Sequence, residues 1–497
     1  MQVPSLLQSL TVRDQIASMR DQMMEAQLQL TTGKKSDTHS GLGVGAPLVL
    51  DLRADIRTQE AYIRSIDQAN LRLSTTQLGL ERVSEISSEI RTFAITSGYE
   101  VIGNDQTQLQ FTAAERLEEM VAVLNTEIGG RYIFGGAASQ DLPVEAYSRI
   151  IEGDIGVAGF RQVVSERAQA DLGVGNMGRL TVPVPAASTV TVTEDVAPPF
   201  GLKLDSVATD LAGVTAAIAG PPPELTVNFT ATLPAAGQTL DVSFTLPDGS
   251  TETITLTAIA AGTPQEGEFV IGADENATAA NFRDALVTEI QTLSQTALRI
   301  ASAHQAATEF FEYDLANPPQ RVDGPPFDTA TALVDATAAD TVFWYRGDTE
   351  TTPVRESMIV KIDDGRTIGY AARADEAPIR ESVKTLAVLV ALDFPEADPL
   401  SQNAYGFATQ RTSRNLAFEG TESLADIRTQ LGLKEWTLGT TRERHERTIN
   451  LSQQLLARTE NADANEVGAR LLQLQNQLSA SYEATAIVSR LSLVNFL

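Results

Sequence analysis

The sequence ADANEVGARLLQLQNQLSASYEATAIVSRLSLVNFL occupies residues 462–497 and closes the chain. Its apolar and small residues recur at alternating spacings of four and three: Val467, Leu471, Leu474, Leu478, Ser481, Thr485 and Val488. This heptad pattern predicts one long helix whose apolar seam requires a partner helix. Because a long helix at a chain end frays unless something packs against it, we expect another helix to cover this seam.

The other end of the chain repeats the pattern. The same four–three alternation joins Val12, Ile16, Met19, Met23, Ala26 and Leu30. Gly33, followed by Lys34 and Lys35, ends this first helix by the usual C-terminal signals. The simplest way to bury both seams is to pair the two terminal helices with each other. An ordinary soluble coiled coil and a helix pair that works inside a polymer both fit this pattern.

Further helices are expected inward of the two ends. Residues 48–97 and 105–128 carry helical periodicity, and helices return at 404–417 and 421–458. The apolar stripe of the helix expected at 48–97 is interrupted by polar Asn70, Gln77, Ser84 and Ser87. Polar residues at such positions fix the register and the partner of a coiled coil at some cost in its stability. The segment GGRYIFGG at residues 129–136 has a β-prone centre between paired glycines, and we expect a short strand there.

The middle of the chain changes character. Strand-like alternation occurs at residues 189–192, 225–233, 240–246, 251–258 and 268–271. Pro247-Asp248-Gly249 and Asp363-Asp364-Gly365 are turn signals, the second inside a strand pair near 356–370. Pro221-Pro222-Pro223 indicates a stiff linker. Helices are expected near 279–311 and 378–392.

These patterns predict a multidomain α+β fold in which paired N- and C-terminal helices enclose β-rich middle domains. We predict four regions: residues 1–45 with 460–497 as a terminal coiled-coil domain, 46–137 with 405–459 as a helical bundle, 138–180 with 276–404 as a mixed α/β middle domain, and 181–275 as an inserted β domain.

Composition narrows the function classes. The formal net charge of −28 disfavours binding to nucleic acid and to anionic membrane surfaces, because both need clustered Lys and Arg. The sequence contains no run of 18 consecutive apolar residues, so no membrane span is expected. The N-terminus lacks the pattern of a cleaved secretory signal. The chain has no cysteine, which excludes disulfides, thiolate metal sites and cysteine nucleophiles.

No catalytic, cofactor-binding or metal-ligating residue is predicted, and no cofactor is expected. The three histidines, His39, His304 and His445, are scattered, and we expect them at the surface or at joints between helices. No Ser/His/Asp order, zinc motif or phosphate loop is visible, so we predict that the protein is not an enzyme. An outward-facing adhesin or binding role of the inserted β domain at 181–275 is an alternative that stays open.

Three segments carry a resemblance to a known family. LQLTTGKK at residues 28–35 resembles the L-S-T-G-K-R segment after the first flagellin helix. LLQLQNQLSASYEATAIVSRLSLVNFL at 471–497 is similar to the closing Q-x-x-L-x-A-S-Y-x-x-x-A-x-I-S-x-L-S-L-x-N-Y-L of that family. GRYIFGG at 130–136 resembles the G-R-Y-L-F-G/S-G of the members that join hook to filament, and WYRGDTETTP at 344–353 also resembles those members. The chain is therefore identified as resembling the flagellin family over roughly its first 137 and last 95 residues.

The resemblance implies a structural component of the bacterial flagellum that joins hook to filament by packing of its terminal helices. The implied partners are further copies in a ring or tubular layer, the first hook-associated protein on the hook side, flagellin on the filament side, and the flagellar export apparatus with an export chaperone. The implied location is extracellular, at the hook–filament junction, after type III export without a cleaved signal peptide. A filament flagellin subunit is the alternative that remains open.

Overall fold

The computed structural model describes residues 3–494 except 104, 186, 196–198, 315–316 and 351, and it describes side chains from residue 10 to residue 487. The chain forms two compact units. We call Met1–Asn70, Lys361–Thr367 and Trp436–Leu497 the terminal unit, and Leu71–Val360 with Ile368–Glu435 the central unit. Long terminal helices and a β-rich middle confirm the predicted α+β class.

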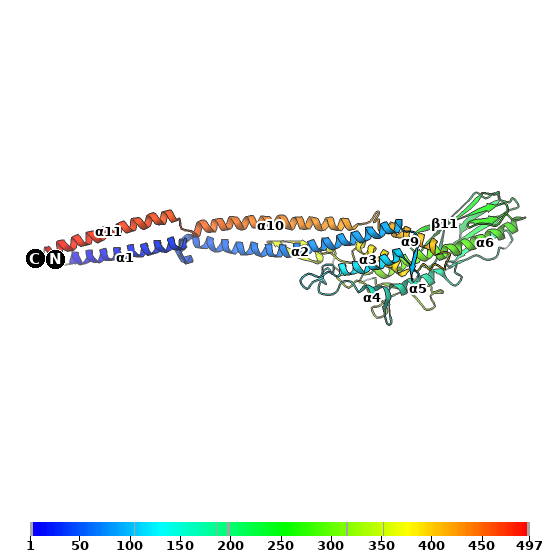
Figure 1. Cartoon of the computed structure of the whole chain (residues 1–497), viewed down its shortest axis with the longest axis horizontal. Coiled ribbons are helices and arrows are strands. Elements are labelled where there is room, and N and C mark those ends of the chain that lie inside the picture. The colour runs from blue at the N-terminus through cyan, green and yellow to red at the C-terminus, as the bar shows by residue number, and fades with distance from the viewer. Residues whose placement is uncertain are drawn as a thin grey trace. The chain divides into compact units, whose positions relative to one another are not determined.

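Helices make up most of the terminal unit. Helices α1 (Val3–Thr32) and α11 (Ala464–Val494) lie side by side, as Figure 1 shows. The 3-10 turn η1 (His39–Gly45) leads into α2 (Ala46–Thr96), whose first half belongs to this unit, as does most of α10 (Leu424–Glu460). The predicted end of the first helix at Gly33 is confirmed, since this glycine adopts φ 70°. At the start of α11, the Asp463 side chain accepts the Asn465 amide at 2.9 Å and caps the helix.

The central unit contains a layer of packed helices. These helices are α3 (Gln108–Leu124), α4 (Tyr147–Glu152), α5 (Phe160–Leu172), α7 (Arg299–Phe311), α8 (Ala377–Ala391) and α9 (Ser401–Asn415). The same unit contains a 3-10 turn, η3 (Val354–Ser357). Helix α8 is buried on nearly every face, as expected for a helix whose last turns are almost wholly apolar. Thr107 and Gln110 form a capping box at the start of α3.

Two four-stranded sheets share one core with helix α6 (Glu275–Leu293). One sheet has the order β5 (Leu180–Thr181), β6 (Thr189–Glu194), β9 (Glu224–Phe229), β8 (Val214–Ala219). The other has the order β12 (Glu268–Val270), β11 (Thr251–Ile259), β10 (Thr239–Thr245), β7 (Lys203–Thr209). Alternate residues of β6, β9 and β10 are buried, which explains the period-two pattern of the sequence.

Four two-stranded pairs complete the fold. They are β1 (Val101–Gly103) with β2 (Gln106–Thr107), β3 (Gly153–Asp154) with β4 (Val157–Ala158), β13 (Gln320–Val322) with β14 (Leu333–Asp335), and β15 (Ile359–Asp363) with β16 (Arg366–Gly369). Both predicted Asp-Gly turns are confirmed, between β10 and β11 and between β15 and β16. The triple proline at 221–223 is a turn between β8 and β9, so the expected linker was wrong.

Two other expectations need correction. GGRYIFGG forms no strand, because Gly129, Gly130 and Gly136 adopt φ between 59° and 77°, and its central residues make only isolated bridges. The expected single helix near 279–311 is interrupted by a π-helical turn, η2 (Ser294–Leu298), between α6 and α7.

The four-region division stays a prediction. One observation bears on where a boundary near residue 275 would fall. Phe282 of α6 contacts Phe229 of β9 and Phe269 of β12, with ring centroids 5.4 Å and 5.3 Å apart. Side chains from both sides of that boundary therefore belong to one core.

Candidate assembly surface

The seam of α1 lies where the sequence predicts it. Val12, Ile16, Met19 and Met23 are half-buried, and Ala26 is buried. The flanking positions on the same helix are exposed, including Arg13, Arg20 and Glu25. Leu30, the last predicted seam residue, is 49% exposed, because the helix pair ends just beyond it.

The seam of α11 also lies where the sequence predicts it, over most of its length. Val467 and Leu474 are buried, and Leu471, Leu478 and Ser481 are half-buried. Thr485 is exposed, and the side chain of Val488 lies outside the described residues. The two predicted seams face each other, so the terminal helices pair within one chain.

A short backbone clasp joins the inner ends of this pair. Lys34 and Asn461 form an antiparallel bridge. The Lys35 amide donates to the Glu460 carbonyl at 2.7 Å, and the Ala462 amide donates to the Gly33 carbonyl at 2.9 Å. The side chain of Lys35 also donates to the Arg458 carbonyl at 3.0 Å. The clasp satisfies carbonyl and amide groups that helix ends leave open.

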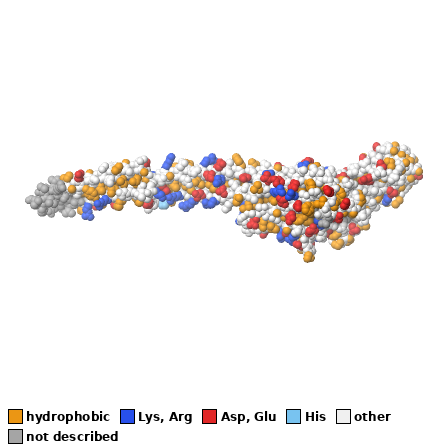
Figure 2. All heavy atoms as spheres, in the orientation of Figure 1, with side chains coloured by type: hydrophobic (Ala, Val, Ile, Leu, Met, Phe, Trp, Pro, Cys, Tyr) orange, Lys and Arg blue, Asp and Glu red, His pale blue; other side chains and the backbone are white. Residues whose placement is uncertain are grey.

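The outer faces of the pair carry exposed apolar side chains among their polar residues. Large side chains at least two-fifths exposed occur on both helices: Leu10, Met24, Leu28, Leu30, Leu472, Tyr482 and Ile487. Figure 2 shows hydrophobic side chains spread along the visible face of these helices. We call six of these residues, all except the seam residue Leu30, the outer apolar set. We take these residues as the candidate assembly surface of the chain.

The inner part of the terminal unit is packed more fully. Val49, Ile66 and Leu438 are completely buried along α2 and α10. Asp67 accepts from Arg442 at 2.8 Å and raises the pKa of that guanidinium. The side-chain oxygens of Gln59 and Asn70 are buried without a hydrogen-bond partner among the described residues, which leaves this seam polar at two positions.

His39 is exposed at the joint between α1 and α2, as expected, whereas His304 and His445 are not at the surface or joint positions that the sequence predicted. His445 is buried, bonds the Ile362 carbonyl through Nε2 at 2.7 Å and stacks on Tyr62, and His304 is buried in the central unit. A signal for His445 exists in the sequence, because it continues the spacing of Leu438 and Thr441 on one face of α10.

The described part of the chain shows neither a candidate metal-binding group nor a helix able to span a membrane. Among residues with described placement, no three His, Asp or Glu side chains gather into a group that could hold a metal ion. None of the helices described there is both long enough and apolar enough to cross a bilayer.

The comparison with known families finds a match in the N-terminal part of the chain. Residues 3–139 match the bacterial flagellin N-terminal helical region. The matched range contains α1, η1, α2, β1, β2, α3 and the GRYIFGG segment. No curated protein matches the chain.

The match supports a flagellin-family protein, and with it a structural role in the bacterial flagellum. Proteins of that family assemble into flagellar polymers outside the cell, and they are structural rather than enzymatic. Part of the outer apolar set lies on α1, inside the matched range, and the rest lies on α11, outside it. The paired helices are thus the candidate functional site of this chain.

Proposed function

We propose that this chain is the hook–filament junction protein of a bacterial flagellum, the third hook-associated protein. In this role it self-associates into a ring or tubular layer. The first hook-associated protein binds on the hook side and flagellin binds on the filament side. The chain reaches this extracellular position through the flagellar export apparatus, accompanied by an export chaperone.

The single observation that carries the proposal is the exposed outer apolar set on an already paired α1 and α11. Leu472 is 61% exposed and Ile487 is 56% exposed, although α1 and α11 already pair with each other. Each large apolar side chain gains roughly 1.5–3 kcal/mol when it leaves water, so covering this set favours assembly with neighbouring subunits.

The GRYIFGG segment supports the junction protein over a filament subunit. Phe134 is completely buried, and its ring packs against Gly79 of α2 so closely that a Cβ there would lie 3.0 Å from ring atoms. The segment therefore locks the end of α3 to α2 within the central unit. Resemblance of this segment to junction proteins is the feature that separates the two alternatives.

Localisation tests the proposal. Immunogold labelling of intact flagella is expected to give one band at the hook end of each filament. Label along the whole filament would identify a filament subunit instead. A deletion strain is expected to secrete flagellin without attached filaments, and attached filaments in that strain would reject the junction role.

A further inference from the structure

Three methionines lie close together on α1. Met19, Met23 and Met24, in the sequence MRDQMM at 19–24, are three of the seven methionines of the chain. Met19 and Met23 occupy successive seam positions and are half-buried, whereas Met24 is 59% exposed. We call these three residues the methionine run. It places thioether groups both in the seam and on the outer surface of the same helix.

The composition of the chain directs oxidants to methionine. The chain contains no cysteine, so no thiol of its own competes for a peroxide. An exposed thioether such as that of Met24 is directly accessible to a small oxidant. Met19 and Met23 become accessible whenever the helix pair opens locally. Met120 of α3, by contrast, is completely buried in the central unit.

The pairing of α1 with α11 depends on side chains of this run. The two helices lie side by side (Figure 1), and the Arg20 guanidinium lies 5.9 Å from the centre of the Tyr482 ring, which places this stretch of α1 against α11. Ala26 is the one fully buried side chain among those described on α1, so half-buried residues make up most of its seam. A polar group at Met19 or Met23 would therefore weaken the contact between the helices.

We propose that the methionine run is a modification site for peroxides, and that sulfoxides at Met19 and Met23 release α1 from α11. In this reaction the Sδ atom attacks one oxygen of hydrogen peroxide, and the O–O bond breaks as the S–O bond forms. Sulfur loses two electrons, and the second oxygen leaves as water with the proton of the first. The product replaces a flexible apolar side chain by a polar one. This inference does not depend on the junction role.

The test treats the purified full-length chain with hydrogen peroxide and measures the oxidation of each methionine by peptide mass spectrometry. Met24 is expected to react first, the two seam methionines next, and Met120 last. Oxidation of Met120 as fast as that of Met23 would contradict the assignment of the site.

Hydrogen exchange on the same samples measures the consequence. Amide protection in residues 10–30 and 464–487 should fall about tenfold once Met19 and Met23 are sulfoxides, because each places a polar group between the helices. Unchanged protection after complete oxidation of both residues would overturn the proposal.

Leucine substitutions separate the seam from the rest of the chain. Met19→Leu with Met23→Leu keeps the apolar volume and removes the sulfur, so peroxide should no longer lower protection in residues 10–30. Met177→Leu with Met358→Leu is the matched control, because these methionines are also half-buried but lie in the central unit. Peroxide should still release the helices of this control. The opposite behaviour of either variant would overturn the proposal.

Two further measurements guard against a fold altered by substitution. Treating the oxidised natural chain with methionine sulfoxide reductases and a thiol reductant should restore both the mass and the amide protection, because these enzymes return the sulfoxide to the thioether. Restored mass without restored protection would contradict the proposal. Met19→Gln with Met23→Gln should lower protection without any oxidant, whereas Met24→Gln at the exposed position should not. Equal effects of these two variants would also contradict it.

Discussion

The core of the central unit and the seam of the terminal helices are both apolar, but they differ in how completely the chain itself covers them. Phe229, Phe269 and Phe282 are at most 2% exposed and pack ring against ring. Among the described side chains of α1 and α11, only Ala26, Val467 and Leu474 are buried. The central unit thus buries its apolar side chains within itself, whereas the terminal pair leaves many of its apolar side chains exposed or half-buried.

The largest effect is expected in the central core. Phe282→Ala should destabilise the central unit by about 3–5 kcal/mol, because it removes a ring that both sheets and α6 bury. Urea unfolding of the full chain, followed by fluorescence and circular dichroism, measures this. Leu472→Ala on exposed surface is the control and should change the same transition by less than about 0.5 kcal/mol. Similar shifts for the two variants would remove the contrast between the units.

The next largest effect is expected from a disulfide cross-link across the clasp. Lys34 and Asn461 are bridge partners flanked by the two backbone hydrogen bonds, so their Cα atoms should be about 4.5 Å apart, within the range for a disulfide. Since the chain has no cysteine, Lys34→Cys with Asn461→Cys gives one possible bond. We expect spontaneous oxidation and about 2–4 kcal/mol of stabilisation of the terminal pair.

Non-reducing electrophoresis and hydrogen exchange of residues 10–30 and 464–487 report on that cross-link. Each single-cysteine variant serves as its control. A double variant that stays reduced under mild oxidant would show that the terminal helices do not pair in the isolated chain.

A smaller effect is expected from pH. Burial lowers the pKa of His304 to about 4, against 6.5 for a free histidine, with Asp248 opposing the shift and Arg411 and Lys384 adding to it. The unfolded chain therefore binds the proton first as pH falls from about 6.5 towards 4, and stability decreases over that window.

His304→Gln should remove on the order of 2 kcal/mol of this pH dependence between pH 7.5 and 4.5. Urea midpoints at the two pH values provide the measurement. His39→Gln, at an exposed position, should leave the dependence as it is. An unchanged pH dependence in His304→Gln would mean that the buried imidazole does not contribute.

The last substitution is expected to have the smallest effect on the stability of the monomer and a large effect on assembly. Leu472→Glu changes an exposed side chain, so the unfolding free energy should stay within about 0.5 kcal/mol. Polymerisation should nevertheless fall sharply, because a charge would be buried between subunits. Sedimentation under polymerising conditions measures this, with Gln473→Glu on the same exposed stretch as a control. Normal assembly of Leu472→Glu would leave the outer apolar set without a role.

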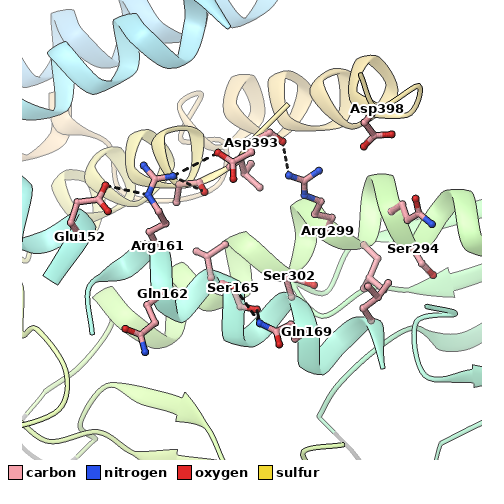
Figure 3. Close-up of a pocket in the computed structure, with 17 residues that line it drawn as sticks. Glu152, Arg161, Gln162, Ser165, Gln169, Ser294, Arg299, Ser302, Asp393 and Asp398 are labelled. Atoms are coloured by element: carbon pink, nitrogen blue, oxygen red, sulfur yellow. Dashed lines mark hydrogen bonds and ion pairs between the residues drawn. The ribbon is translucent and has the colours of Figure 1, made fainter. Parts of the chain in front are cut away.

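Local sequence patterns were enough to predict the long helices, the terminal pairing and both Asp-Gly turns. The helices and their seams depend on residues three or four positions apart, as with Leu474 and Leu478, and the turns depend on adjacent residues. GRYIFGG was predicted wrongly because its conformation follows from glycine φ values and from burial of Phe134 against Gly79, a contact distant in sequence. A hollow of the central unit, whose lining includes Ser294 and Ser302 (Figure 3), could not be predicted from the sequence, because it forms only where α5, η2 and the connection from α8 to α9 meet.

The clasp also has a consequence for biosynthesis. Lys35 and Arg458 are separated by 423 positions, so the ribosome must add nearly the whole sequence before their contact can form. At about 5–20 residues per second, α1 waits roughly 20–85 s for its partner. During that interval a nascent amphipathic segment is available to any cytosolic factor that recognises it.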